Sequence, residues 1–120
     1  MKGYITEIKQ PKIMLKVFGK DEIKDVEFLV DTGFDGEILL SSSLVEEMFL
    51  EPIDTRLVEL ADGTGKTVFV SIAEIEWYGQ RKEIDVLVGE TTAEPLLGTE
   101  LLQNSKLFID FPNEIVKIEK

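Results

Sequence analysis

The chain has 120 residues, neither cysteine nor histidine, and a formal net charge of −11 at pH 7. This length allows one domain, covering residues 1–120, and a composition of 43% hydrophobic and 31% charged residues is typical of a globular protein. The missing residue types exclude disulfides, thiol nucleophiles, Ser-His-Asp triads and the usual zinc sites. Acid–base chemistry must therefore use carboxylates, lysine or tyrosine, and we expect no metal or other cofactor.

The acidic charge also restricts partners and location. A strongly negative surface offers no counterion release to nucleic acid and repels anionic lipid, so neither is an expected partner. No apolar run approaches the ~20 residues of a membrane span. The first seven residues include an acid and lack the apolar stretch of a secretory signal, which makes the cytoplasm the expected location.

Short strands separated by glycine turns begin the chain. Residues 13–18 and 26–30 flank the turn signal at residues 19–21 and predict a hairpin. A short strand is expected at residues 37–40. Ser43 and Glu46 then have capping-box spacing, which predicts a two-turn helix that ends near Leu50.

The second half continues the same pattern. Residues 56–60 and 67–72 predict a hairpin with a glycine-rich tip, and further strands are expected at 75–77 and 84–88. A short helix is expected at 99–104, before two final strands at 107–111 and 115–118. Many short strands with one or two short helices predict a mainly β protein, either a barrel or a sandwich.

Two short strings match parts of other motifs. Gly65-Lys66-Thr67 resembles the end of a phosphate-binding loop, but Leu60 stands where that motif needs glycine, and the segment lies between strands. Residues 31–36 resemble the start of a calcium loop, but Gly33 and Ser42 stand where two ligands belong. We therefore expect neither a phosphate-binding loop nor a calcium site.

The triplet Asp31-Thr32-Gly33 is the strongest candidate for a catalytic motif. Alone it is a common turn, because aspartate caps the backbone and glycine tolerates unusual torsions. Here it follows Phe28-Leu29-Val30, where the alternation of apolar and polar residues is lost, as in a strand buried on both faces. A carboxylate is therefore expected at the end of a central strand.

Two further elements follow Asp31-Thr32-Gly33 in order: the glycine-tipped hairpin and then Leu96-Leu97-Gly98. In this order and spacing the chain resembles the retropepsin-like (clan AA) aspartic proteases, and among them small prokaryotic members, over about residues 13 to 118. The resemblance implies a closed six-stranded acid protease barrel with one lobe per chain.

The resemblance also implies a role for each matching residue. Asp31 is the expected catalytic aspartate, Thr32 the hydroxyl that interlocks with its symmetry mate, and Gly33 the residue that lets a substrate backbone approach. The expected substrate-binding residues are Phe34 and Asp35 after the catalytic turn, Asp62, Gly63, Thr64 and Gly65 at the flap tip, and Leu97 and Gly98, which would also pack under the active-site loop.

The chemistry of this family requires two neighbouring carboxylates that share one proton, because two like charges so close cannot both ionise cheaply. The chain has one such triplet at the end of a buried strand, so we expect a homodimer in which each copy supplies one Asp31. The expected activity is hydrolysis of peptide bonds in a peptide or unfolded polypeptide.

Two residues depart from the family pattern. Phe34 stands where a small residue is usual, and Thr99 stands where retroviral members have an arginine that pairs with the position of Asp35. A salt bridge there is therefore not expected. These departures keep a second interpretation open, in which the same fold is a catalytically inactive dimeric module that binds peptides or acts as a scaffold.

Overall fold

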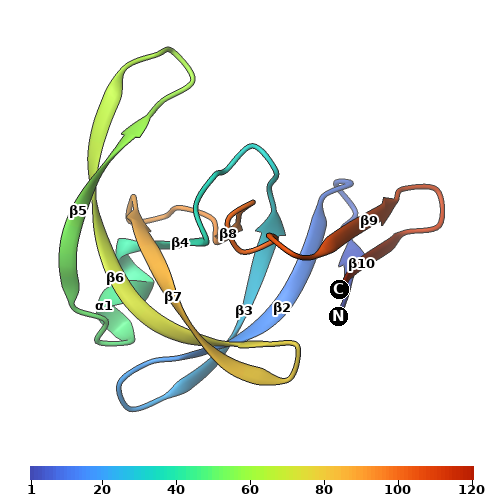
Figure 1. Cartoon of the computed structure of the whole chain (residues 1–120), viewed down its shortest axis with the longest axis horizontal. Coiled ribbons are helices and arrows are strands. Elements are labelled where there is room, and N and C mark those ends of the chain that lie inside the picture. Colours follow the sequence, from blue (N-terminus) through green and yellow to red (C-terminus); the bar gives the residue numbers. More distant parts are fainter.

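Ten strands and one short helix make up the computed structural model, which describes residues 1–120 (Figure 1). The helix is α1 (Ser42–Glu47). The strands are β1 (Lys2–Ile5), β2 (Pro11–Phe18), β3 (Ile23–Val30), β4 (Ile38–Ser41), β5 (Pro52–Glu59), β6 (Gly65–Trp77), β7 (Gln80–Gly89), β8 (Leu96–Leu97), β9 (Lys106–Asp110) and β10 (Ile115–Glu119).

Six of these strands close a barrel in the order β6-β7-β4-β8-β3-β2. The ring closes where β2 pairs with β6, with Val17 opposite Ile75 and Phe18 opposite Glu74. This closure confirms the six-stranded barrel expected from the sequence. The barrel also confirms the hairpin of β2 and β3 and the hairpin of β5 and β6.

The barrel interior is filled by alternate residues of each strand, as the period of two in a strand dictates. In β2, Ile13, Leu15 and Val17 are buried while Met14 and Lys16 are exposed. Phe28 of β3 is the largest fully buried side chain of a core of 19 residues. Each such side chain contributes about 1.5–3 kcal/mol through burial.

Two parts extend beyond the barrel. The hairpin of β5 and the first half of β6 projects from one side and curves over the top of the view in Figure 1. On the other side β1, β10 and β9 continue the sheet outward from β2. β1 was missed by the sequence analysis, because four residues with a single buried side chain give little periodicity.

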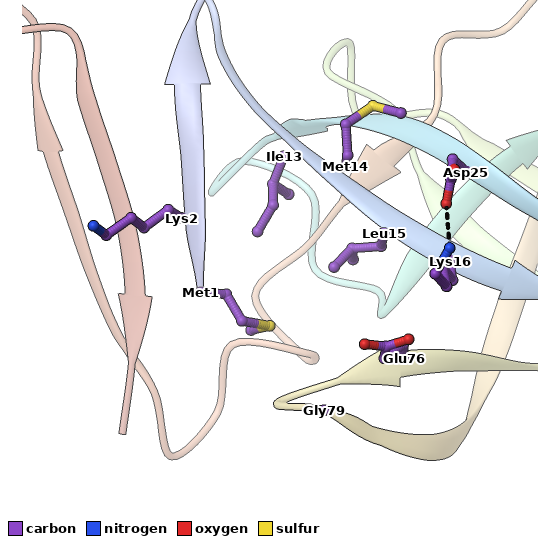
Figure 2. Close-up of a pocket in the computed structure, with 9 residues that line it drawn as sticks. All are labelled: Met1, Lys2, Ile13, Met14, Leu15, Lys16, Asp25, Glu76 and Gly79. Carbon is purple, nitrogen blue, oxygen red and sulfur yellow. Dashed lines mark hydrogen bonds and ion pairs between the residues drawn. The ribbon is translucent and has the colours of Figure 1, made fainter.

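The N-terminus is tied to the C-terminal strand. The amino group of Met1 donates to the carbonyl of Ile118 at 2.6 Å, and the amide of Ile118 donates to the carbonyl of Met1 at 2.8 Å. Met1 lines a small hollow of about 230 Å³ beside β2 and the β6–β7 turn, where Lys16 and Asp25 pair at 3.1 Å (Figure 2). This hollow contains none of the expected site residues.

Two helix predictions need correction. The helix cap is Ser41, whose hydroxyl accepts from the amide of Leu44 at 3.2 Å, and not the expected Ser43. Three consecutive serines can each cap a helix, and the end of β4 selects the first. Residues 99–104 form turns and no helix: the amides of Gln103 and Ser105 donate to the carbonyls three residues earlier, of Glu100 and Leu102, and no helical ladder of four-residue steps follows.

No helix in the structure has both the length and the apolar character needed to cross a membrane.

Candidate active site

Asp31 is the first residue after β3, at the rim of the barrel. Its amide donates to the carbonyl of Leu97 at 2.9 Å, and its carbonyl accepts from the amide of Phe34 at 3.1 Å, which closes a tight turn. The carboxylate oxygen Oδ1 accepts from the amide of Gly33 at 2.9 Å. Asp31 is half-buried, whereas Thr32 and Gly33 are exposed. A carboxylate thus lies in a fixed orientation at the surface, beside an exposed hydroxyl.

The loop of residues 31–37 is held from below by the segment around β8. This two-residue strand lies between β3, which it meets in parallel, and β4, which it meets antiparallel. Beyond β8, the amide of Gly98 donates to the carbonyl of Glu37 and the amide of Thr99 to that of Phe34, both at 2.9 Å. Backbone carbonyls of the active-site loop therefore receive their hydrogen bonds from residues more than sixty positions away along the chain.

Gly98 is required at its position by close packing. A Cβ atom there would lie 2.3 Å from the carbonyl oxygen of Gly36 and 2.6 Å from that of Phe34. At Gly36, a Cβ would lie 2.5 Å from Cζ of the Phe34 ring. The ring of Phe34 therefore packs onto two glycines of its own site. This contact explains how the site accommodates a phenylalanine where the family usually has a small residue.

The hairpin of β5 and β6 forms the expected flap. Gly63 at its tip has a φ of 85°, a left-handed torsion that suits glycine. Oδ1 of Asp62 accepts from the amide of Thr64 at 2.9 Å and from its hydroxyl at 2.6 Å, and these hydrogen bonds hold the pKa of Asp62 below its usual value. The turn is thus locally stabilised although every tip residue is exposed.

A cavity of about 720 Å³ separates the flap from the active-site loop. Gly33, Phe34 and Asp35 line one side of it. The other walls are β4 with the start of α1, the flap hairpin, and the segment from β7 to β8, which together contribute Leu39, Ser42, Val58, Glu59, Leu60, Lys66, Thr67, Val68, Phe69, Leu87, Val88, Gly89, Glu90, Thr91, Ala93, Glu94 and Leu96. Ten of the 20 lining residues are hydrophobic, and Asp35, Glu59, Glu90 and Glu94 add carboxylates. Such a cavity suits an apolar side chain of an extended peptide.

Comparison with known proteins agrees with this geometry. A family model described as aspartyl protease matches residues 13–101, which is well over half of the chain. The chain belongs to the aspartyl protease family. No curated protein is similar enough in sequence to match it.

Two solved structures show the retropepsin-like fold of this aspartyl protease family member. A retropepsin-like aspartic protease from Rickettsia conorii aligns with a TM-score of 0.65 at 19% identity, covering 99% of this chain and 88% of that one. EIAV protease in complex with the inhibitor HBY-793 aligns with a TM-score of 0.60 at 18% identity, covering 82% of this chain and 90% of that one. At these identities the likeness establishes the fold.

The structure brings only part of the expected site together. Asp31 and Thr32 lie beside the cavity, while Gly33, Phe34 and Asp35 line it. The flap tip, Asp62 to Gly65, does not line the cavity. Only the flap residues on either side of the tip do so. Leu97 is 0% exposed and Gly98 is buried, which does not fit direct binding of substrate. These two residues position the loop instead.

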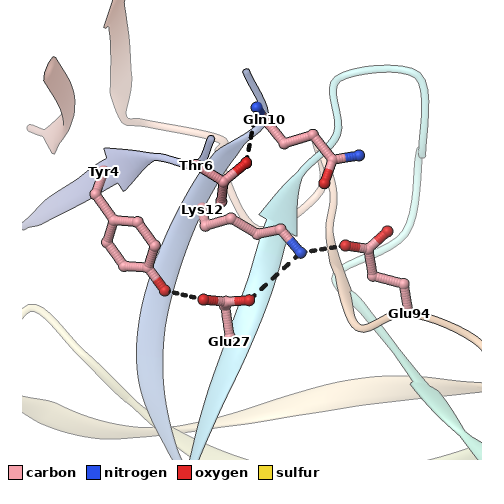
Figure 3. Close-up of polar contacts among 6 residues, drawn as sticks. All are labelled: Tyr4, Thr6, Gln10, Lys12, Glu27 and Glu94. Carbon is pink, nitrogen blue, oxygen red and sulfur yellow. Dashed lines mark hydrogen bonds and ion pairs between the residues drawn. The ribbon is translucent and has the colours of Figure 1, made fainter. Parts of the chain in front are cut away.

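Lys12 is a residue of the site region that sequence reasoning missed. It is the one buried charged residue of the chain, with a side chain 9% exposed, and it contacts carboxylates from two other segments (Figure 3). Its ammonium pairs with Glu27 of β3 at 3.5 Å and with Glu94, which lines the cavity. Lys12 thereby fixes a cavity wall to the barrel. A lysine at the start of an apolar strand carries no local signal of this role.

Two further ion pairs lie at the flap. Lys66 of β6 pairs with Glu90, which follows β7, and this contact lowers the pKa of Glu90. Arg56 of β5 pairs with Asp85 of β7 at 3.3 Å. Both strands of the flap are therefore connected to the barrel wall by charge.

Proposed function

We propose that this chain is an aspartic endopeptidase that acts as a homodimer, with one Asp31 from each copy. The observation that carries the proposal is the half-buried carboxylate of Asp31, held at the barrel rim beside an apolar cavity under a flap. One carboxylate cannot act as base and acid in the same step. A second copy related by a two-fold axis supplies the other.

In the proposed reaction, the ionised carboxylate of one Asp31 takes a proton from a water molecule, and the oxygen of that water attacks the carbonyl carbon of the peptide. The protonated Asp31 of the second copy donates to the carbonyl oxygen, which gives a tetrahedral diol. The C–N bond then breaks as the leaving nitrogen receives a proton from the dyad. The products are a carboxylic acid and an amine, with one water consumed.

The substrate is a peptide or unfolded polypeptide in an extended conformation. The main chain of such a segment can pair with strand edges while alternate side chains enter pockets. The cavity of about 720 Å³, lined by side chains such as Leu39, Leu87 and Phe34, supports a preference for an apolar residue next to the cleaved bond.

The alternative is a dimeric module that binds a peptide in the same cavity without cleaving it. The position of Phe34 favours it, because this ring lines the cavity and packs against Gly36 and Gly98. Both functions use the same cavity, so they differ only in the chemistry at Asp31.

The experiment that separates them is a cleavage assay with the full chain and with Asp31→Asn, using unfolded polypeptide and a peptide library between about pH 4 and 7. Asparagine is close in shape to aspartate, so the variant isolates the chemistry from folding. Asp21→Asn, in the exposed turn between β2 and β3, is the matched control. Cleavage by the wild type and the control, but not by Asp31→Asn, supports the enzyme. Binding of peptide without cleavage at any pH supports the alternative.

A further inference from the structure

We propose that the cavity under the flap selects peptides that carry an arginine or a lysine close to the apolar residue, and that Asp35 and Glu59 recognise this positive charge. The inference rests on the proposed function, because it concerns a peptide bound in the same cavity. It deepens that function by adding a charge to the apolar character of the substrate.

The lining of the cavity contains more acidic than basic side chains. Among its 20 residues, four are carboxylates and one, Lys66, is a cation; the carboxylates are Asp35, Glu59, Glu90 and Glu94. A concave site lined mainly by one sign of charge attracts ligands of the opposite sign, because its low-dielectric walls concentrate the field. The carboxylates that lack a partner within the chain are the ones available to such a ligand.

Two of the four carboxylates are paired with a lysine of the chain. Lys66 pairs with Glu90 across the flap. Lys12, with a side chain 9% exposed, pairs with Glu94 (Figure 3). Because Lys12 is buried, its pair with Glu94 is a fixed part of the cavity wall. The charges of Glu90 and Glu94 are therefore balanced before a ligand arrives.

Asp35 and Glu59 have no such partner. Neither takes part in any of the seven ion pairs of the chain, and both residues are exposed. Thr99 contacts the same loop as Asp35, but its amide and its hydroxyl both donate to the carbonyl of Phe34 and supply no positive charge. These two carboxylates are thus the uncompensated charges of the cavity.

The two carboxylates lie on the two elements between which a peptide would bind. Asp35 belongs to the active-site loop, and Glu59 is the last residue of β5 in the flap. An arginine or lysine can lay its aliphatic stem along the apolar lining and still bring its charged head to a carboxylate. No three acidic side chains of the chain are grouped as a metal ion would require, so a cationic side chain of the peptide is the fitting partner.

Matched peptides test the selection of charge. Each pair of peptides carries either arginine or citrulline, which has nearly the same shape without the charge, at one position within about three residues of the apolar residue. At one or more positions the wild type should cleave the arginine peptide with a kcat/KM about five times that of the citrulline peptide at low salt. High salt should bring this ratio towards one, because it screens exposed charges. A glutamate at the same position should be cleaved more slowly than citrulline.

Substitutions test the two residues. Asp35→Asn and Glu59→Gln should each lower the ratio of arginine to citrulline cleavage about twofold, and the double variant should bring it close to one. Glu59→Lys should favour the glutamate peptide over the citrulline peptide. Asp21→Asn also removes one negative charge, in the exposed turn between β2 and β3, and should leave the ratio unchanged. Circular dichroism checks that each variant folds.

Binding to Asp31→Asn, measured by fluorescence anisotropy with the same labelled peptides, keeps the test independent of cleavage. Tighter binding of the arginine peptides without any cleavage by the wild type supports the charge selection and overturns the protease activity. Asp31-dependent cleavage with a ratio near one at every position overturns the charge selection and leaves the protease proposal standing. An equal fall of the ratio in Asp21→Asn assigns the effect to overall charge and overturns the roles of Asp35 and Glu59. Neither binding nor cleavage of any peptide overturns both proposals.

Discussion

Gly98 lies directly beneath Phe34, so close that a Cβ on the glycine would be 2.6 Å from both the carbonyl oxygen and Cδ2 of Phe34. The contact joins the segment after β8 to the loop that carries Asp31. Two of the three nearest atoms are backbone carbonyl oxygens, of Gly36 and Phe34, which leaves little room for adjustment. The geometry of the candidate catalytic loop therefore depends on a residue that is buried beneath it.

Gly98→Ala should destabilise the fold by about 3 kcal/mol, because the added methyl group must displace the active-site loop. The free energy of unfolding in urea measures this. Gly33→Ala is the matched control, since a Cβ there meets only Oδ1 of Asp31 at 3.1 Å. That variant should fold with near wild-type stability but lose cleavage activity, because the carboxylate must shift. An unchanged midpoint for Gly98→Ala would contradict the proposed support of the loop.

Lys12→Met should destabilise the protein by about 1–2 kcal/mol, because it leaves Glu27 and Glu94 without their shared cation. A double-mutant cycle with Glu94→Gln measures the coupling between the two residues, which we expect to be about 1 kcal/mol. Lys16→Met removes a well-exposed pair with Asp25 and should cost no more than about 0.5 kcal/mol. Equal losses in the two lysine variants would argue against a special role for Lys12.

Tyr4 should make stability depend on pH in the alkaline range. Desolvation of the phenol and its hydrogen bond to Glu27 raise the pKa of Tyr4 to about 12, above the value of about 10 in an unfolded chain. A raised pKa means that the stabilisation is present below about pH 10 and is lost as the pH rises through about 12. The difference in free energy of unfolding between wild type and Tyr4→Phe should therefore shrink over this range. A difference that stays constant would refute the linkage.

The flap should loosen when its ion pair with the barrel is removed. Lys66→Met and Glu90→Gln should each speed hydrogen exchange of the flap amides, and high salt should abolish the difference from wild type. The ion pair lowers the pKa of Glu90, so the pair is present at neutral pH. Its stabilisation is lost as the pH falls through the lowered pKa of Glu90 in the folded state. Lys24→Met, which breaks a pair with Glu47 at the end of α1, should leave flap exchange unchanged.

Local patterns predicted the parts of the fold whose signals are local. The two hairpins have turn residues at fixed offsets. The segment Phe28-Leu29-Val30 predicts a central strand because apolar and polar residues no longer alternate there. The predictions failed where several local choices compete. Any of Ser41, Ser42 and Ser43 can cap a helix, and residues 99–104 close turns of three-residue hydrogen bonds instead of a helix.

By itself, the sequence determined that acid–base chemistry cannot use histidine or cysteine and that Asp31 follows a buried strand, because residue types and strand period are properties of short segments. Only the tertiary structure decided how that carboxylate is supported. β8 has two residues, too few for a periodic signal, and its place between β3 and β4 comes from non-local pairing. The burial of Lys12, the packing of Phe34 on Gly98 and the free edge of β9 likewise depend on elements that meet only after the barrel has closed.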